Sequence, residues 1–346
     1  MKDETNFGDE NDNKMNICDK NKKENGNSFN YKKCADCKKH WDDTLSTNCS
    51  IVEPNKQNLN SEKNKNNINC NKLNEECISE DELKINFKNV TEYYDDILQN
   101  LNEEEKNKSN INSNYFNYQS EITPNMRSTL IDWIIDIIHI FKFKEETLYI
   151  TIYIIDAYLS KKNIVKSKFQ LLGVTSLFIA SKLNEIILRR ISDYSDITDK
   201  TYSIQEIQNM EIEILKTLNF ELLVPSPLSF YEIISQKVGI SDDINKYKFG
   251  EFLMQSFLIN NQSLNYTSSN IACATCYIIM KFCKMQNYRI FFDNNFFNDK
   301  NVREYTIKDC ARKMCETIHI IINSNLKSTI NKFSDNIFYN IMKNNM

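Results

Sequence analysis

Residues 126–141 read MRSTLIDWIIDIIHIF, and this stretch decides the fold class of the chain. Large apolar side chains fill almost every position after Leu130, so a helix formed here has hardly any polar face. A helix that is apolar all round must be covered by neighbours on most sides. The stretch therefore predicts the central helix of a bundle, with His139 as a packed or hydrogen-bonded core residue.

Helical patterns continue beyond this stretch. Further helices are expected at about 145–160, 166–187 and 203–219, and, after Pro225 and Pro227, at about 227–238, 244–261, 267–286 and 305–324. Aligning 166–182 with 265–281 superimposes two helices that are both rich in small residues, which indicates an internal repeat. The sequence predicts an all-α protein made of two tandem five-helix units.

Composition argues against several classes of protein. The chain has 346 residues but only 5 Gly and 4 Pro, which disfavours a sheet with many tight turns. The formal net charge of −4 provides no basic field for a phosphate backbone, so nucleic acid is not expected as a partner. No apolar run reaches about 18 residues, and the start MKDETNFGDE lacks an apolar segment, so neither a membrane nor export is expected. The 11 Cys are then expected to be reduced thiols.

Four regions are expected along the chain. Residues 1–85 are dominated by Asn, Lys, Asp, Glu and Ser and lack a hydrophobic period, so this tail is expected to be disordered. Residues 86–120 are expected to form an N-terminal helix and an Asn-rich connector. The two helical units are then expected at 121–222 and 223–342.

No metal or cofactor site is predicted. Cys34 and Cys37 have the spacing of one zinc-binding pair, with His40 and Cys49 nearby, but a single pair is too little for a structural zinc site. The three His have no partner at a catalytic or metal-binding spacing, and the sequence has no Gly-rich phosphate loop. The sequence therefore predicts no catalytic residue.

Four segments resemble the cyclin box of A- and B-type cyclins, in the same order and at the same spacing. They are MRSTLIDWIIDI (126–137), EETLYITIYIIDAYLS (145–160), KFQLLGVTSLFIASKLNEI (168–186) and ITDKTYSIQEIQNMEIEILKTLNF (197–220). The resemblance continues more faintly over 221–342, which looks like the second cyclin fold. It implies a non-catalytic regulatory subunit, in the nucleus and cytoplasm, that binds and activates a cyclin-dependent protein kinase in cell-cycle control.

The resemblance also implies a face that binds the kinase. Lys182 and Glu211 would pair on this face, although an ordinary ion pair between two helices fits the same residues. The remaining residues of the kinase face, each of which core packing could also explain, are Ile97, Leu183, Glu185, Ile186, Leu215, Phe220 and Leu222.

A second implied surface is a docking groove for substrate peptides of the Arg-x-Leu type. Met126, Leu130 and Trp133 share one stripe of a helix. The resemblance adds Phe169 and Gln170, and Asp136 would attract the peptide's Arg. A stripe at this spacing is also typical of a core, and the expectation of an exposed Trp133 is what favours the groove.

The resemblance points to two further sets of residues. Arg127 and Asp156 fall within apolar helices, where an unpaired charge is costly, so they are expected to pair in a structural role, as the matching residues of the family do. In the tail, Lys23-Glu24-Asn25 matches a degradation signal of mitotic regulators, which would bring ubiquitin-ligase machinery as a partner. The triplet also arises by chance in a tail of this composition.

Three departures from the family pattern leave alternatives open. Thr129 lies in the groove, Asn184 lies beside Lys182, and Leu188-Arg189-Arg190 stands where a Pro-rich turn is typical. One alternative is a scaffold that keeps the fold but does not activate a kinase. The others are a transcriptional cyclin, and a general transcription factor of the B type, which would need a zinc ribbon and a basic surface that the sequence does not show.

Overall fold

The computed structural model describes residues 93–108, 111–285 and 300–344. Three of the features discussed above lie outside these ranges: the tail, the Cys34 and Cys37 pair, and the Lys23-Glu24-Asn25 triplet. Every regular element within the ranges is helical, as the all-α prediction requires. No helix among them is long and apolar enough to cross a membrane.

The first unit is a bundle built around one helix. Its elements are α4 (Pro124–Phe141), α5 (Glu145–Lys161), α6 (Phe169–Asn184), α7 (Ile191–Asp196) and α8 (Ile204–Thr217). Helix α6 packs against the other four and so occupies the centre of the bundle. Local signals set the helix starts: the Thr123 side chain accepts a hydrogen bond from Met126 N, and Ser203 and Glu206 form a capping box before α8.

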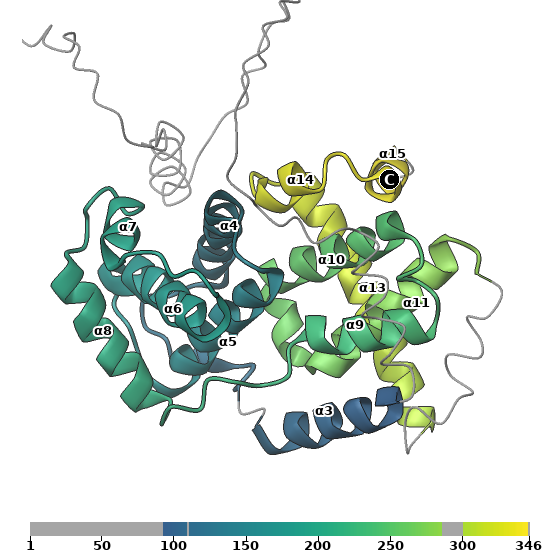
Figure 1. Cartoon of the computed structure of the whole chain (residues 1–346), viewed down its shortest axis with the longest axis horizontal. Helices are drawn as coiled ribbons and strands as arrows, with labels where there is room; N and C mark the ends of the chain where they lie inside the picture. Colours follow the sequence, from purple (N-terminus) through teal and green to yellow (C-terminus); the bar gives the residue numbers. More distant parts are fainter. Residues whose placement is uncertain (1–92, 109–110, 286–299, 345–346) are drawn as a thin grey trace, which may run out of the picture.

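The second unit repeats this arrangement. Its helices within the described residues are α9 (Pro227–Lys237), α10 (Ile244–Ile259), α11 (Ser268–Phe282), α13 (Lys300–Ile322) and the short α14 (Ser328–Lys332), and α15 (Ile337–Asn344) follows. Helix α11 packs against α9, α10 and α13. The two helices that the internal alignment superimposes, α6 and α11, are therefore the central helices of their units. The predicted pair of five-helix units is confirmed (Figure 1).

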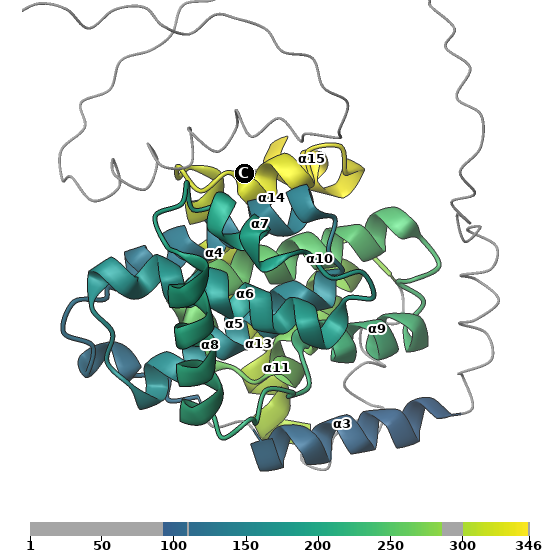
Figure 2. The same ribbon diagram turned by 60° about the vertical axis from the view of Figure 1, so that its left-hand side comes forward.

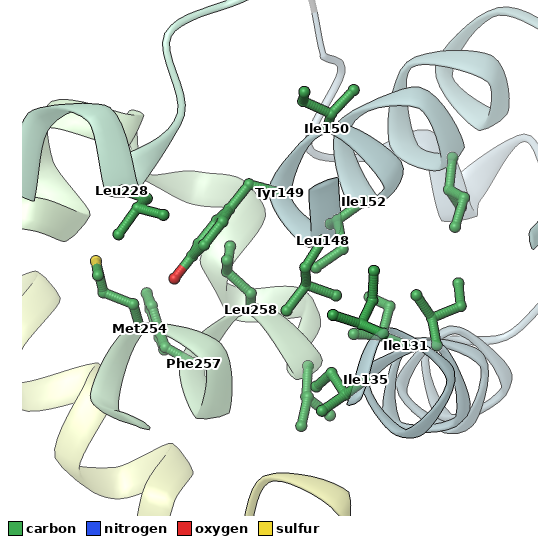
Figure 3. Close-up of a cluster of buried hydrophobic side chains, with 14 of the residues drawn as sticks. Ile131, Ile135, Leu148, Tyr149, Ile150, Ile152, Leu228, Met254, Phe257 and Leu258 are labelled. Carbon is green, nitrogen blue, oxygen red and sulfur yellow. The ribbon is translucent and has the colours of Figure 1, made fainter. Parts of the chain in front are cut away.

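A continuous apolar core joins the two units. Helix α4 packs against α5 and α6 of its own unit and against α10 and α14 of the other. Figure 3 shows Ile131 and Ile135 of α4 close to Leu148 of α5, while Tyr149 points toward Met254 and Phe257 of α10.

The apolar character of α4 therefore reflects its place between the units. The sequence correctly predicted neighbours on most sides of α4, but the second unit supplies part of that cover, and α6 rather than α4 is the central helix of the first unit. The prediction for His139 was wrong: it is exposed in the last turn of α4, where the neighbouring Ile140 is also exposed.

The N-terminal helix docks on the second unit although it precedes the first in sequence. Helix α3 (Tyr94–Lys108) packs against α9, below the body of the molecule in Figures 1 and 2. Lys237 pairs with Asp95 at 2.6 Å, and the Tyr94 hydroxyl donates to Gln236. Near the other end of α3, Glu105 accepts hydrogen bonds from Ser269 at the start of α11. Helix α3 is thus fastened to the second unit at both ends.

Candidate functional site

Lys182 and Glu211 form an ion pair between the end of α6 and the middle of α8. The Lys182 ammonium also lies 4.3 Å from the centroid of the Phe178 ring, which helps to position it. The Lys182 side chain remains more than one third exposed, whereas Glu211 is more buried. The pair therefore fixes the relative position of two helix faces and leaves a cation accessible to a partner.

Large apolar side chains are exposed in the segments of chain that follow the two partners of this pair. Leu183, Ile186 and Phe220 are all exposed, Phe220 at 70% of its surface. Leu215 is partly buried on α8. Exposed apolar side chains gathered beside one charged group are typical of surfaces that bind another protein.

The other predicted residues of the kinase face lie elsewhere. Leu222 is buried and lines a cavity of about 260 Å³ between the two units. Ile97 is half-buried on α3, the helix that packs on the second unit.

Glu185 has a structural partner that the sequence did not reveal. Its carboxylate accepts a hydrogen bond from Lys144 N at 2.8 Å and another from the Thr147 hydroxyl. Lys144 is the N-cap of α5, and its side chain makes no capping hydrogen bond. Glu185 therefore provides an acceptor for a backbone N–H group at the start of that helix. Asn184 also donates to the Thr147 hydroxyl, at 2.9 Å. These two residues bind the end of α6 to the start of α5.

Phe220 sits in an unusual backbone conformation. After α8 ends, Asn219 and Phe220 have φ angles of 51° and 60°, and Phe220 N donates to Leu215 O at 3.0 Å. Left-handed backbone is common for Asn at a helix end but is strained for a bulky side chain. The backbone is therefore strained at Phe220, a residue whose ring is exposed. Backbone strain of this kind is frequent at functional sites.

The predicted groove residues form a stripe, but most of the stripe is buried. Leu130 and Phe169 are fully buried, Met126 is nearly so, and Trp133 is only 8% exposed, so the expectation of an exposed Trp was wrong. Leu130 is covered by close packing of α4 on α6: a Cβ on Gly173 would lie 2.6 Å from Leu130 Cδ1. Only Asp136 and Gln170 of the predicted set are partly exposed.

Arg127 and Asp156 meet in the core through two hydrogen bonds, Nε to Oδ1 at 2.7 Å and Nη2 to Oδ2 at 2.6 Å. Arg127 Nη1 donates further to the carbonyl oxygen of Leu258 in the second unit, at 3.0 Å. In the described part of the chain, no group of three or more His, Cys, Asp or Glu is placed to hold a metal ion.

The structure combines tandem five-helix units with exposed apolar side chains near an ion pair, a kind of surface that is typical of protein-binding sites. Family models for the cyclin N-terminal domain and the cyclin C-terminal domain match residues 96–223 and 225–344. The chain belongs to the cyclin family.

Its relatives include mitotic cyclins. The chain is 36% identical to the G2/mitotic-specific cyclin-B of Hydra vulgaris over 197 residues, 57% of this chain and 54% of the relative. It is 34% identical to the G2/mitotic-specific cyclin-B of Spisula solidissima over 259 residues, 73% of this chain and 58% of the relative. The chain thus spans about half of the length of the curated relatives it matches.

A solved structure shares the fold. A viral cyclin from Herpesvirus saimiri matches with a TM-score of 0.55 at 17% identity, over 64% of this chain and 97% of the viral chain. At this identity the match supports the tandem cyclin fold alone.

Proposed function

We propose that this chain is a mitotic-type cyclin that binds and activates a cyclin-dependent Ser/Thr protein kinase in cell-cycle control. Cyclins are regulatory subunits rather than enzymes, and the relatives are G2/mitotic cyclins. The observation that carries the proposal is the Lys182–Glu211 pair, with Leu183, Ile186 and Phe220 exposed in the segments that follow its two partners. A transcriptional cyclin or a general transcription factor fits these relatives less well.

Activation would follow from differential binding. A kinase interconverts between states in which its catalytic Lys–Glu pair is broken or formed, and a partner shifts this equilibrium only if it binds one state more tightly. The exposed side chains of Leu183, Ile186 and Phe220 would bury apolar surface against the mobile regulatory helix of the kinase, and this burial would supply most of the binding free energy. The ion pair would fix the orientation of the contact.

The test mixes the full chain with a panel of purified cyclin-dependent kinases and measures histone phosphorylation. Lys182→Ala/Glu211→Ala is compared with Lys308→Ala/Glu304→Ala, which removes an exposed ion pair from α13 of the second unit. Stimulation by the wild type and the α13 variant, but not by the first variant, is expected. Binding without stimulation would support a scaffold, and no binding to any kinase would contradict the proposal.

A second proposal concerns substrate peptides of the Arg-x-Leu type. Asp136 and Gln170 are the partly exposed members of the stripe on α4 and α6, and Asp136 has the charge that attracts the Arg of such a peptide. Because Trp133 is nearly buried, the contact would be shallow. Titrating a labelled Arg-x-Leu peptide into the wild type and into Asp136→Lys tests it: equal affinity, or no binding to either, rejects the groove.

A further inference from the structure

The segment at 185–190, EIILRR, connects α6 to α7 and has an unusual distribution of side chains. Ile186 is 86% exposed, Ile187 83% and Leu188 54%. Three consecutive aliphatic side chains thus face solvent, whereas the residues on either side of them bond to the protein.

The polar residues of the segment hold its backbone to the turn between α4 and α5. Glu185 accepts hydrogen bonds from Lys144 N and the Thr147 hydroxyl at one end. At the other end, Arg189 Nη2 donates to Phe141 O at 3.3 Å, and the Arg189 guanidinium lies 5.1 Å from the centroid of the Phe141 ring. The segment is therefore fixed in place before any partner binds, which reduces the entropy cost of binding.

The segment is continuous with the proposed kinase face. It begins at Glu185, directly after α6, and the last turn of α6 carries Lys182 and Leu183. Arg190 then adds a cation whose side chain is 86% exposed and lies 3.7 Å from Asp193. An aliphatic stretch that ends in an exposed cation matches a protein surface with apolar side chains and a nearby carboxylate.

We propose that Ile187, Leu188 and Arg190 form a second contact with the same kinase, beyond the face centred on Lys182 and Glu211. The inference rests on the proposed function. The segment stands where a Pro-rich turn is typical of the resembling family. A kinase that makes this contact must present, opposite the segment, an apolar patch with at least one Asp or Glu beside it.

The test uses the full chain and the cyclin-dependent kinase that the wild type activates most strongly. Dissociation constants are measured by calorimetry for Ile187→Ser/Leu188→Ser, for Arg190→Glu, and for the matched control Ile337→Ser/Ile341→Ser, which alters two exposed aliphatic residues on α15. The segment variant should weaken binding roughly tenfold or more, and Arg190→Glu roughly threefold, most strongly at low salt. The α15 control should stay within about twofold of the wild type.

The outcomes separate the two proposals. Wild-type affinity in both segment variants overturns the second contact and leaves the proposed function intact. If the wild type binds no kinase, both proposals fail. Melting temperatures are measured for all variants, and if the double variant loses stability, Ile187→Ser alone, at the more exposed position, decides the result.

Discussion

Arg127 of α4 and Asp156 of α5 form an ion pair that is closed to solvent, with 2.6 Å between Arg127 Nη2 and Asp156 Oδ2. The Tyr115 hydroxyl donates to the same carboxylate at 2.9 Å, and Arg127 reaches the Leu258 carbonyl in the second unit. One buried ion pair therefore links α4, α5, the segment before α4 and the second unit.

Removing one partner of this pair should strongly destabilise the protein. Asp156→Ala leaves the Arg127 guanidinium buried without its counterion, which should lower the free energy of unfolding by about 3–5 kcal/mol. Lys162→Ala, which breaks the exposed pair with Glu213, should cost less than about 1 kcal/mol. Chemical denaturation of both variants measures the difference, and equal small losses would show that the buried pair contributes little.

A substitution at Phe220 should affect protein stability and kinase binding differently. Asn tolerates the left-handed backbone that Phe220 adopts at φ 60°, so Phe220→Asn should leave the melting temperature unchanged or raise it. The same variant should weaken kinase activation, because it removes an exposed apolar ring from the proposed face.

The matched control for Phe220 is Lys142→Asn at the end of α4, where φ is 55°. Like Phe220→Asn, it should leave the melting temperature unchanged or raise it, but it should leave kinase activation unchanged. A clear loss of stability in Phe220→Asn would mean that the ring serves the fold rather than a partner.

Two buried carboxyl groups should make stability depend on pH. Burial raises the pKa of Glu146 on α5 and that of Glu251 on α10 to about 7 each. The folded state therefore binds more protons than the unfolded chain between about pH 4.5 and pH 7, so these groups make the free energy of unfolding fall as pH rises through that window.

Glu146→Gln and Glu251→Gln should each raise stability at about pH 8 by roughly 1–3 kcal/mol and flatten this dependence. Denaturation between about pH 5 and pH 8 measures the free energy of unfolding of each variant and of the wild type. Taking the difference removes the contribution of the exposed groups, which both proteins share. A difference that does not change with pH would contradict the raised pKa values.

Glu105 should hold α3 on the second unit. Its carboxylate accepts from Ser269 N at 2.9 Å and from Ser269 Oγ at 2.6 Å. Glu105→Ala removes both bonds and should speed amide hydrogen exchange throughout α3, with a stability loss of about 1–3 kcal/mol. Glu103→Ala on the exposed side of the same helix is the control and should leave exchange in α3 unchanged. Equal exchange in both variants would mean that α9 alone holds the helix.

Much of the fold could be predicted because helical periodicity is local. The positions of α4, α5 and α8 follow directly from their apolar patterns. The expected helix over 166–187 was too long: it begins with a 3₁₀ turn and α6 ends at Asn184, because Glu185 turns to the start of α5. Such a contact joins residues far apart in sequence, and no local pattern reveals it. Helix α7 is too short to show a period.

The candidate site was less accessible to sequence reasoning. The resemblance placed Lys182 beside Glu211, but residue type cannot tell which apolar side chains face solvent. Trp133 was expected to be exposed, although an all-apolar helix already indicated cover on most sides. The exposure of Ile187 and the left-handed backbone of Phe220 depend on how α6 and α8 end. Those helix ends are set by contacts in the folded chain, which no local sequence pattern reveals.

The central claim is that the ends of α6 and α8 bind a cyclin-dependent kinase. Amide hydrogen exchange of the full chain, alone and with the kinase it activates, tests this most directly. Added protection is expected to concentrate at 182–190 and 215–224, with the outer face of α13 unchanged. Protection confined to the second unit, with none at 182–190, would contradict it.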